Sequence, residues 1–211
     1  MLFGNPEGAN RRAMTHRVHN SQDVRVVTLT RDYATDPADL WNALTDPDRI
    51  ARWFLPVTGE LKPGGRYQLK GNASGLIEKC EPPTVLHLTW EFGEQISWVV
   101  ARVEANGDLA TLKLEHMMPK DAASQEHWRQ YGPGATGVGW ELSLLALGIH
   151  FSTDGKAIDA ADFEAWTTSD DGKTFVKHCA QQWGEAHIAS GADSSEARTT
   201  AARTGAFYSG E

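Results

Sequence analysis

Three polar side chains lie at positions where they could take part in chemistry: Glu78, Arg102 and His116. Each lies in a stretch with the alternation of a β-strand, so each points to one face of a sheet. An inward-pointing His116 could anchor a polar group, or act as an acid or base near neutral pH. A carboxylate such as Glu78 would have a raised pKa inside a cavity and could serve as a base. Arg102 could pair with Glu78 or with an acidic ligand.

Each of these residues also has a purely structural interpretation. His116 would bond to the backbone, whereas Glu78 and Arg102 would be solvated charges on a sheet. Alternation puts Glu115 and His116 on opposite faces of their strand, so they cannot act as an adjacent pair without a bulge. Catalysis therefore requires at least two of the three groups to meet in one pocket.

An apolar pocket is the second kind of site that the residue types allow. Aromatic side chains give a large contact area at low entropy cost, which suits flat apolar ligands. The alternative is that these side chains fill the core, because an empty cavity loses packing contacts. The candidate pocket residues are Trp53, Phe54, Trp90, Trp98, Trp140, Leu144 and Leu147.

The sequence does not favour a metal or cofactor site. The eight histidines include no His-x-x-x-His pair, and Cys80 and Cys179 are the only cysteines. Neither a Gly-x-Ser-x-Gly elbow nor a phosphate-binding Gly-x-x-x-x-Gly-Lys loop occurs. We therefore expect no metal and no cofactor. Two free thiols are typical of a cytoplasmic protein.

The candidate residues depend on an apolar stretch at Gly137–Phe151 that we expect to form a long helix. At about 100° per residue, apolar side chains fall on two opposite sides of this helix. One side carries Trp140, Leu144, Leu147 and Phe151, and the other carries Val138, Leu142, Leu145 and Ile149. A helix with two apolar sides must be covered on both. We expect a curved sheet on one side and later helices on the other.

The rest of the chain supplies these two layers. A strand at 24–31 is followed by two short helices, each beginning at an Asp-Pro pair, Asp36-Pro37 and Asp46-Pro47. Short strands with tight turns between 57 and 116 predict a six-stranded antiparallel meander, which makes about seven strands in all. After the long helix, Asp159, Ser169 or Asp170, and Asp193 can begin three more helices. Phe175 and Trp183 should be buried against the long helix.

These elements predict three segments. Residues 1–22 lack periodicity and are expected to form a disordered tail. Residues 23–152 form an α+β ligand-binding domain, and 153–211 form a helical extension packed on the long helix. Residues 117–136, rich in glycine near their end, are expected to be a flexible connection.

Several local sequences, taken in order, resemble the SRPBCC superfamily of START-like, helix-grip proteins. They are Leu29-Thr-Arg31, Asp46-Pro47 leading to Ala51–Phe54, Pro63–Tyr67, Glu81-Pro82-Pro83 running to Thr89-Trp90, and the strand that ends at His116. The chain looks most like the branch named for the activator of the heat-shock-protein-ninety ATPase, related to polyketide cyclases. The resemblance implies a helix-grip fold with a hydrophobic cavity between sheet and long helix. Members bind lipids, hormones or polyketides, and some catalyse cyclisation.

Composition narrows the classes of partner. The formal net charge of −8 argues against a nucleic-acid binder, and no run of about 18 apolar residues suggests a membrane span. The main hypothesis is the binding of a small apolar molecule by a monomer or homodimer. The alternatives are a cyclase- or hydrolase-type enzyme that uses the same cavity, and an interaction module that resembles the chaperone activator.

Overall fold

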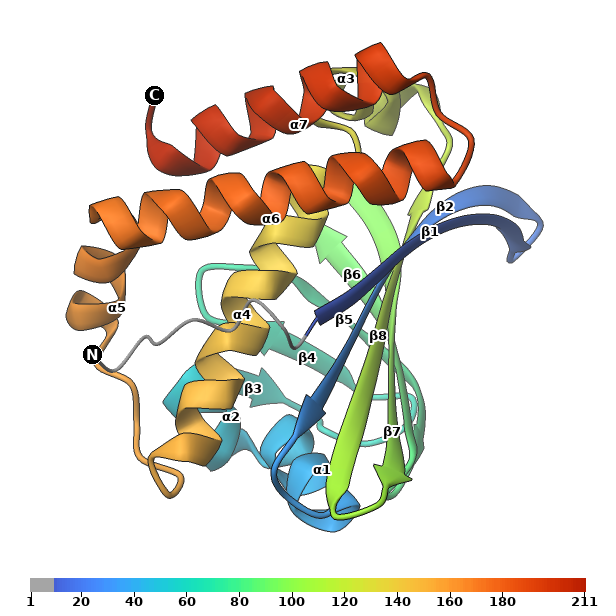
Figure 1. Cartoon of the computed structure of the whole chain (residues 1–211). Helices are drawn as coiled ribbons and strands as arrows, with labels where there is room; N and C mark the ends of the chain where they lie inside the picture. The colour runs from blue at the N-terminus through green and yellow to red at the C-terminus, as the bar shows by residue number, and fades with distance from the viewer. Residues whose placement is uncertain (1–9) are drawn as a thin grey trace.

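One curved antiparallel sheet encloses a long helix in the computed structural model, which describes residues 10–211 (Figure 1). The strands lie in the order β1-β2-β8-β7-β6-β5-β4-β3. The sheet consists of β1 (Asn10–His19), β2 (Gln22–Tyr33), β3 (Val57–Gly59), β4 (Arg66–Leu69), β5 (Ser74–Glu81), β6 (Val85–Phe92), β7 (Gln95–Asn106) and β8 (Leu109–Pro119). This confirms the predicted helix-grip fold, with one strand more than expected.

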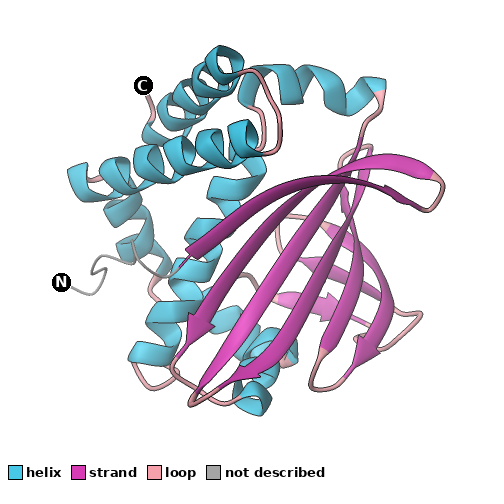
Figure 2. Ribbon diagram, turned by 45° about the vertical axis from the view of Figure 1, so that its right-hand side comes forward, coloured by secondary structure: helices cyan, strands magenta, loops and turns pink. Residues whose placement is uncertain are grey.

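The helices gather on the concave side of the sheet (Figure 2). They are α1 (Pro37–Thr45), α2 (Pro47–Trp53), α3 (Ala122–Tyr131), α4 (Gly134–Ser152), α5 (Ala160–Thr168), α6 (Asp170–Ala189) and α7 (Ser194–Ser209). Asp36 and Asp46 cap α1 and α2 as predicted, by accepting hydrogen bonds from Asp39 N and Arg49 N. Ser169 caps α6.

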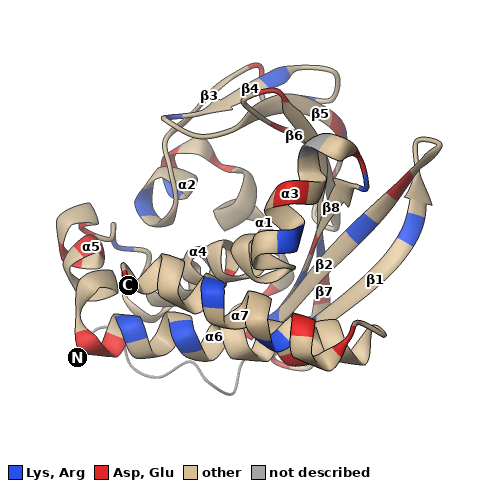
Figure 3. Ribbon diagram, turned by 90° about the horizontal axis from the view of Figure 1, so that it is seen from above, with Lys and Arg blue, Asp and Glu red and all other residues tan. Residues whose placement is uncertain are grey.

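The long helix α4 is covered on both sides, as its two apolar faces require. It packs on β2 and α2 on one side and on α6 and α7 on the other. Trp183 of α6 is fully buried, as predicted, whereas Phe175 is half-buried. The fit is close because Gly137 lacks a side chain: a Cβ there would lie 2.2 Å from the Trp183 ring. Seen from above, α6 and α7 lie side by side, with acidic and basic residues interspersed (Figure 3).

The predicted disordered tail over residues 1–22 is wrong for the part that the structure describes; residues 1–9 lie outside it. Residues 10–19 form β1, an edge strand, paired with β2 from Asn10 opposite Arg31 to His19 opposite Gln22. The two strands are joined at Asn20 and Ser21, which both have positive φ (48° and 62°), as in a two-residue hairpin turn. An Asn-Ser pair is a weak turn signal, because the usual second residue is glycine.

The predicted connection at 117–136 is also more ordered than expected. Strand β8 continues to Pro119, and α3 follows, with Asp121 accepting a hydrogen bond from Ser124 N. The long helix then begins at Gly134, three residues before the predicted start. Few apolar residues mark α3, so its helical periodicity was weak in the sequence.

Candidate ligand-binding site

A cavity of about 690 Å³ opens between the first half of α4 and the sheet. Its walls come from the β6–β7 hairpin, the end of β8, α3 and α4, with Tyr208 of α7 at one side. This volume lies within the roughly 300–1,000 Å³ typical of small-molecule sites. Phe92 and Ile96 at the hairpin are 60% and 52% exposed and give the cavity an apolar edge on this side. The cavity can therefore admit an apolar molecule of ordinary ligand size.

A second, smaller apolar space of about 150 Å³ also lies between α4 and the sheet. Phe54, Trp90 and Trp140 line both spaces. The ring centroids of Trp90 and Trp140 are 5.2 Å apart, and those of Phe54 and Trp140 are 6.3 Å apart. These three rings, called the aromatic constriction below, are shared by the two spaces, and a flat apolar group can stack against them.

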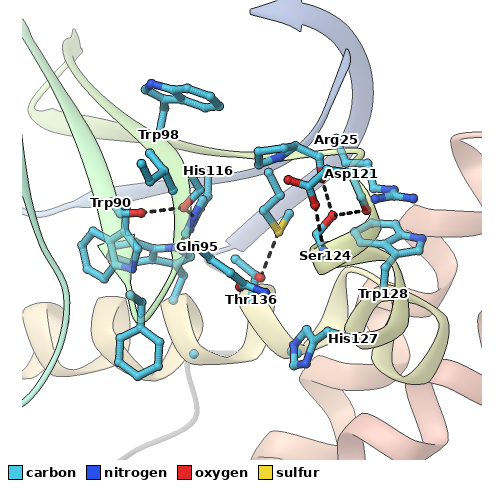
Figure 4. Close-up of a pocket in the computed structure, with 18 of the residues that line it drawn as sticks. Arg25, Trp90, Gln95, Trp98, His116, Asp121, Ser124, His127, Trp128 and Thr136 are labelled. Carbon is cyan, nitrogen blue, oxygen red and sulfur yellow. Dashed lines mark hydrogen bonds between the residues drawn. The ribbon is translucent and has the colours of Figure 1, made fainter. Parts of the chain in front are cut away.

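His116 is the buried polar group beside this constriction. Trp140 Nε1 donates a hydrogen bond to His116 Nδ1 over 2.9 Å, and His116 Nε2 lies 2.8 Å from Ser97 Oγ. An indole N–H can only donate, so Nδ1 must be unprotonated and Nε2 carries the proton. His116 Nε2 therefore donates to Ser97 Oγ, which in turn donates to Trp90 O over 3.1 Å. Figure 4 shows His116 next to Trp90 at this end of the cavity.

Protonation of His116 is disfavoured by its surroundings. Burial lowers the pKa of His116 from 6.5 to about 4, so the ring is neutral at pH 7. A serine nucleophile needs a histidine that accepts its proton. His116 Nε2 already carries a proton, and its other nitrogen is occupied by Trp140. This arrangement fixes the wall of a binding site and does not activate Ser97.

The opposite end of the cavity is polar (Figure 4). Arg25, 7% exposed, lies with its guanidinium 4.5 Å from the centroid of the Trp128 ring. Its Nη2 donates to Gln125 Oε1 over 2.6 Å, and Asp121 is its acidic neighbour. The sequence analysis missed Arg25, although it shares the strand face of the core residues Val27 and Leu29. The signal in the sequence that could have identified Arg25 was an arginine on an otherwise apolar strand face.

Seven of the ten predicted pocket residues border the two spaces: Trp53, Phe54, Trp90, Trp98, His116, Trp140 and Leu144. Leu147 is fully buried and belongs to the filled core. Trp98 reaches the rim of the larger cavity but lies on the outer face of the sheet, where it packs with Val26 and the His19 ring. For Trp98, the alternation of β7 decides the face: Ser97 and Val99 point inward.

Glu78 and Arg102, both expected in the pocket, do not line either space. Arg102 lies between the core residues Ala101 and Val103, so alternation turns it to the outer face. Glu78 directly follows the buried Ile77, so alternation turns it to the exposed outer face. The pairing of β5 with β6 is irregular between Ile77 and Lys79, and after this bulge Cys80 again lines the smaller space. Of the three candidate chemical groups, only His116 faces the cavity.

A buried ion pair that the sequence analysis missed lies outside the cavity. Glu141 of α4 is fully buried and accepts hydrogen bonds from Arg12 Nε and Nη2 at 2.7 and 2.6 Å. Asn10, Cys179 and Trp183 donate to the same carboxylate. The group thus joins β1, α4 and α6, and its role is structural.

Over residues 10–211, no group of three or more His, Cys, Asp or Glu side chains is arranged to hold a metal ion. In the same range, no helix has both the length and the apolar content needed to cross a membrane. The two cysteines are free thiols, Cys179 buried and Cys80 half-buried.

The family model described as activator of Hsp90 ATPase homolog 1-like protein matches residues 34–151. The crystal structure of CalU16 from Micromonospora echinospora is 30% identical, with a TM-score of 0.68, and covers 84% of this chain and 98% of CalU16. The solution structure of CalU16 gives 28% identity and a TM-score of 0.71 over 88% of this chain and 100% of CalU16.

A more distant structure shares the fold alone. The Aha1 dimer from Colwellia psychrerythraea is 13% identical, with a TM-score of 0.51, and covers 63% of this chain and 98% of that one. Among curated proteins, none matches the chain.

Proposed function

Because the chain belongs to the family of activator of Hsp90 ATPase homolog 1-like proteins, within the SRPBCC-type helix-grip superfamily, we propose that it binds a small, flat, apolar ligand. Family and fold support a ligand-binding domain in general terms. The finer proposal is that the ligand enters the cavity of about 690 Å³ and that no reaction follows. The free thiols support the cytoplasmic location expected from the sequence.

The observation that carries this proposal is the aromatic constriction of Phe54, Trp90 and Trp140. Trp90 and Trp140 are half-buried, so part of each ring faces the open space. The Nε1 of Trp140 is held by His116, which orients the indole before any ligand arrives. A preoriented ring loses little entropy on binding, and this favours affinity for a flat partner.

A cyclase or hydrolase is the weaker alternative. It would need two chemical groups to converge in the cavity, and Glu78 and Arg102 lie outside it. The remaining group, His116, is neutral and hydrogen-bonded at both nitrogens. Interaction with a chaperone, the third hypothesis, is supported by the family name alone. Retention of the chain on the middle domain of Hsp90 in a pull-down would support it.

A fluorescence titration tests the binding proposal. The probe is 1-pyrenemethanol, a neutral flat molecule, titrated into the wild-type chain and followed by quenching of tryptophan emission. We expect one site per chain, and we expect Trp140→Leu to weaken binding at least tenfold because it removes the oriented ring. Native mass spectrometry of protein purified from its source should show a bound small molecule.

Trp166→Leu is the matched control, because Trp166 lies in α5 and lines neither of the two spaces. Its affinity for 1-pyrenemethanol should stay within about twofold of the wild type, well below the tenfold change that 1.4 kcal/mol would produce. Equal affinity of the wild type and Trp140→Leu would overturn the assignment of the site.

A further inference from the structure

Arg25 is a buried cation that the protein pairs only in part. Its side chain lines the cavity at the end opposite the aromatic constriction (Figure 4). Nη2 is bonded to Gln125 Oε1, whereas the buried Nη1 has no hydrogen-bond partner among the described residues. A buried polar group without a partner costs roughly 1–3 kcal/mol, and more when it is charged.

The acidic neighbour of Arg25 does not replace this missing partner. Asp121 already accepts a hydrogen bond from Ser124 N over 2.8 Å and thereby caps α3. The positive end of the helix dipole partly offsets this carboxylate. The positive charge of Arg25 also acts on His187. Burial is the largest cause that lowers the pKa of His187, and the charge of Arg25 lowers it further. Burial also lowers the pKa of Arg25 itself.

The two ends of the cavity therefore favour different chemical groups of a ligand. One end offers flat aromatic rings, and the other is lined by Arg25, whose buried Nη1 lacks an acceptor. A neutral carbonyl of a ligand would accept the hydrogen bond from Arg25 but would leave its positive charge unpaired. A carboxylate would satisfy both, and hydrogen bonds between charged groups are about twice as strong as neutral ones.

We propose that the ligand is an amphipathic carboxylate, whose flat apolar body stacks at Phe54, Trp90 and Trp140 and whose carboxylate accepts a hydrogen bond from Arg25 Nη1. This inference rests on the proposed function and specifies the substrate class of the same cavity. Arg25 is then a specificity-determining residue, held in place by Gln125 and by the face of Trp128.

Pairs of probes that differ only in charge test the inference. The acids are 1-pyreneacetate, 1-pyrenebutyrate and 1-pyrenehexanoate, a series that varies the reach between ring and carboxylate, and each is compared with its carboxamide by titration at pH 7.5. In the wild type, the best-fitting acid should bind at least tenfold more tightly than its amide. In Arg25→Met this preference should vanish, while the affinity for the amide changes by less than about threefold.

Arg102→Met is the matched control, since Arg102 is a strand arginine on the outer face of the same sheet and does not line the cavity. It removes the same charge from the protein and should keep the preference for the acid. Loss of the preference in both variants would point to the net charge of the protein and would overturn the role of Arg25. Circular dichroism of each variant checks folding.

Nuclear magnetic resonance of the wild type tests the role of Arg25 even if Arg25→Met does not fold. The guanidinium resonances of a buried arginine should shift when the acid is added and remain in place when the amide is added. Equal binding of acids and amides by the wild type contradicts the inference but leaves the proposed function intact. Binding of neither kind of probe contradicts the proposed function itself.

Discussion

At the scale of single residues, His116 shows how a group suited to catalysis is held in a binding role. Its Nδ1 accepts from Trp140, and its Nε2 donates to Ser97. Both bonds require the neutral ring, and burial disfavours the charged form. If a carboxylate took the place of Trp140 at Nδ1, the same histidine could act as a base. The identity of the neighbour at Nδ1 therefore decides the chemistry.

The low pKa of His116 predicts a pH dependence of stability. In the unfolded chain this histidine takes up its proton near pH 6.5, but in the folded protein only near pH 4. Between these values the unfolded state binds more protons, so stability falls as the pH falls. The contribution lost is about 3 kcal/mol, at 1.36 kcal/mol per pKa unit.

His116→Gln, whose amide can still accept from Trp140 and donate to Ser97, should flatten this dependence. Urea denaturation at pH 7, 6, 5 and 4 measures it for both proteins. Other histidines with lowered pKa act in the same direction in both proteins and cancel in the difference; they are His16, His87, His150 and His187. Parallel curves for the two proteins would refute the assignment.

At the scale of elements, the buried carboxylate of Glu141 fastens three segments that are distant in the sequence. Arg12 comes from β1, and Cys179 and Trp183 come from α6. The Arg12 pair is bidentate, with 11% of the Arg12 side chain exposed. Removal of one partner would leave a buried charge incompletely compensated.

Arg12→Met should therefore lower the free energy of unfolding by about 3–5 kcal/mol. Arg11→Met is the control on the same strand, because Arg11 forms an ion pair with Asp32 on the opposite face and is 59% exposed. Exposed pairs contribute roughly 0–1 kcal/mol, so the control should be close to the wild type. Urea denaturation of both variants measures the difference, and equal effects would count against a structural role for Glu141.

The contact of α4 with α6 gives a second prediction at this scale. Alanine is normally a better helix former than glycine by about 1 kcal/mol. At Gly137 the added methyl would meet the Trp183 ring at 2.2 Å, so Gly137→Ala should destabilise the protein by about 1–3 kcal/mol through overpacking. At Gly139 the nearest atom is Tyr208 Oη at 3.1 Å, so Gly139→Ala should change stability by less than about 1 kcal/mol. Thermal unfolding compares the two variants.

At the scale of the whole molecule, the helices after α4 complete the core. Helix α6 supplies Val176, Cys179 and Trp183, all buried in the cluster that contains Leu144 and Leu147. Helix α7 supplies Tyr208, which donates to Ala135 O over 2.7 Å at the start of α4. These helices therefore support both the core and one side of the cavity.

Truncation after Ser152 should expose the apolar side of α4 and leave Glu141 without Trp183 and Cys179. An exposed apolar surface of this kind promotes association. We expect the truncated chain to aggregate in size-exclusion chromatography and to bind anilinonaphthalene sulfonate strongly, in contrast to the full chain. A truncated chain that stayed monomeric and unfolded cooperatively would show that the core is complete without the extension.

The sequence by itself determined the features that depend on neighbours along the chain. Helix caps such as Asp36 and Asp46 act within three residues, and apolar periodicity reports the faces of one element at a time. These local rules predicted the long sandwiched helix, the meander and the later helices. Together with the ordered set of short motifs, they were sufficient for the helix-grip fold.

Only the tertiary structure decided which side chains meet. Strand β1 carries little apolar periodicity, and it is held by its pairing with β2 and by contacts such as that of Arg12 with Glu141, which are 129 residues apart. The bulge in β5 placed Ile77 and Cys80 on the same face, with Glu78 outside, because one irregular residue reverses the face of everything after it. The same holds for the cavity. Arg25 and Trp140 line it from elements far apart in the sequence, and no local pattern encodes the space between them.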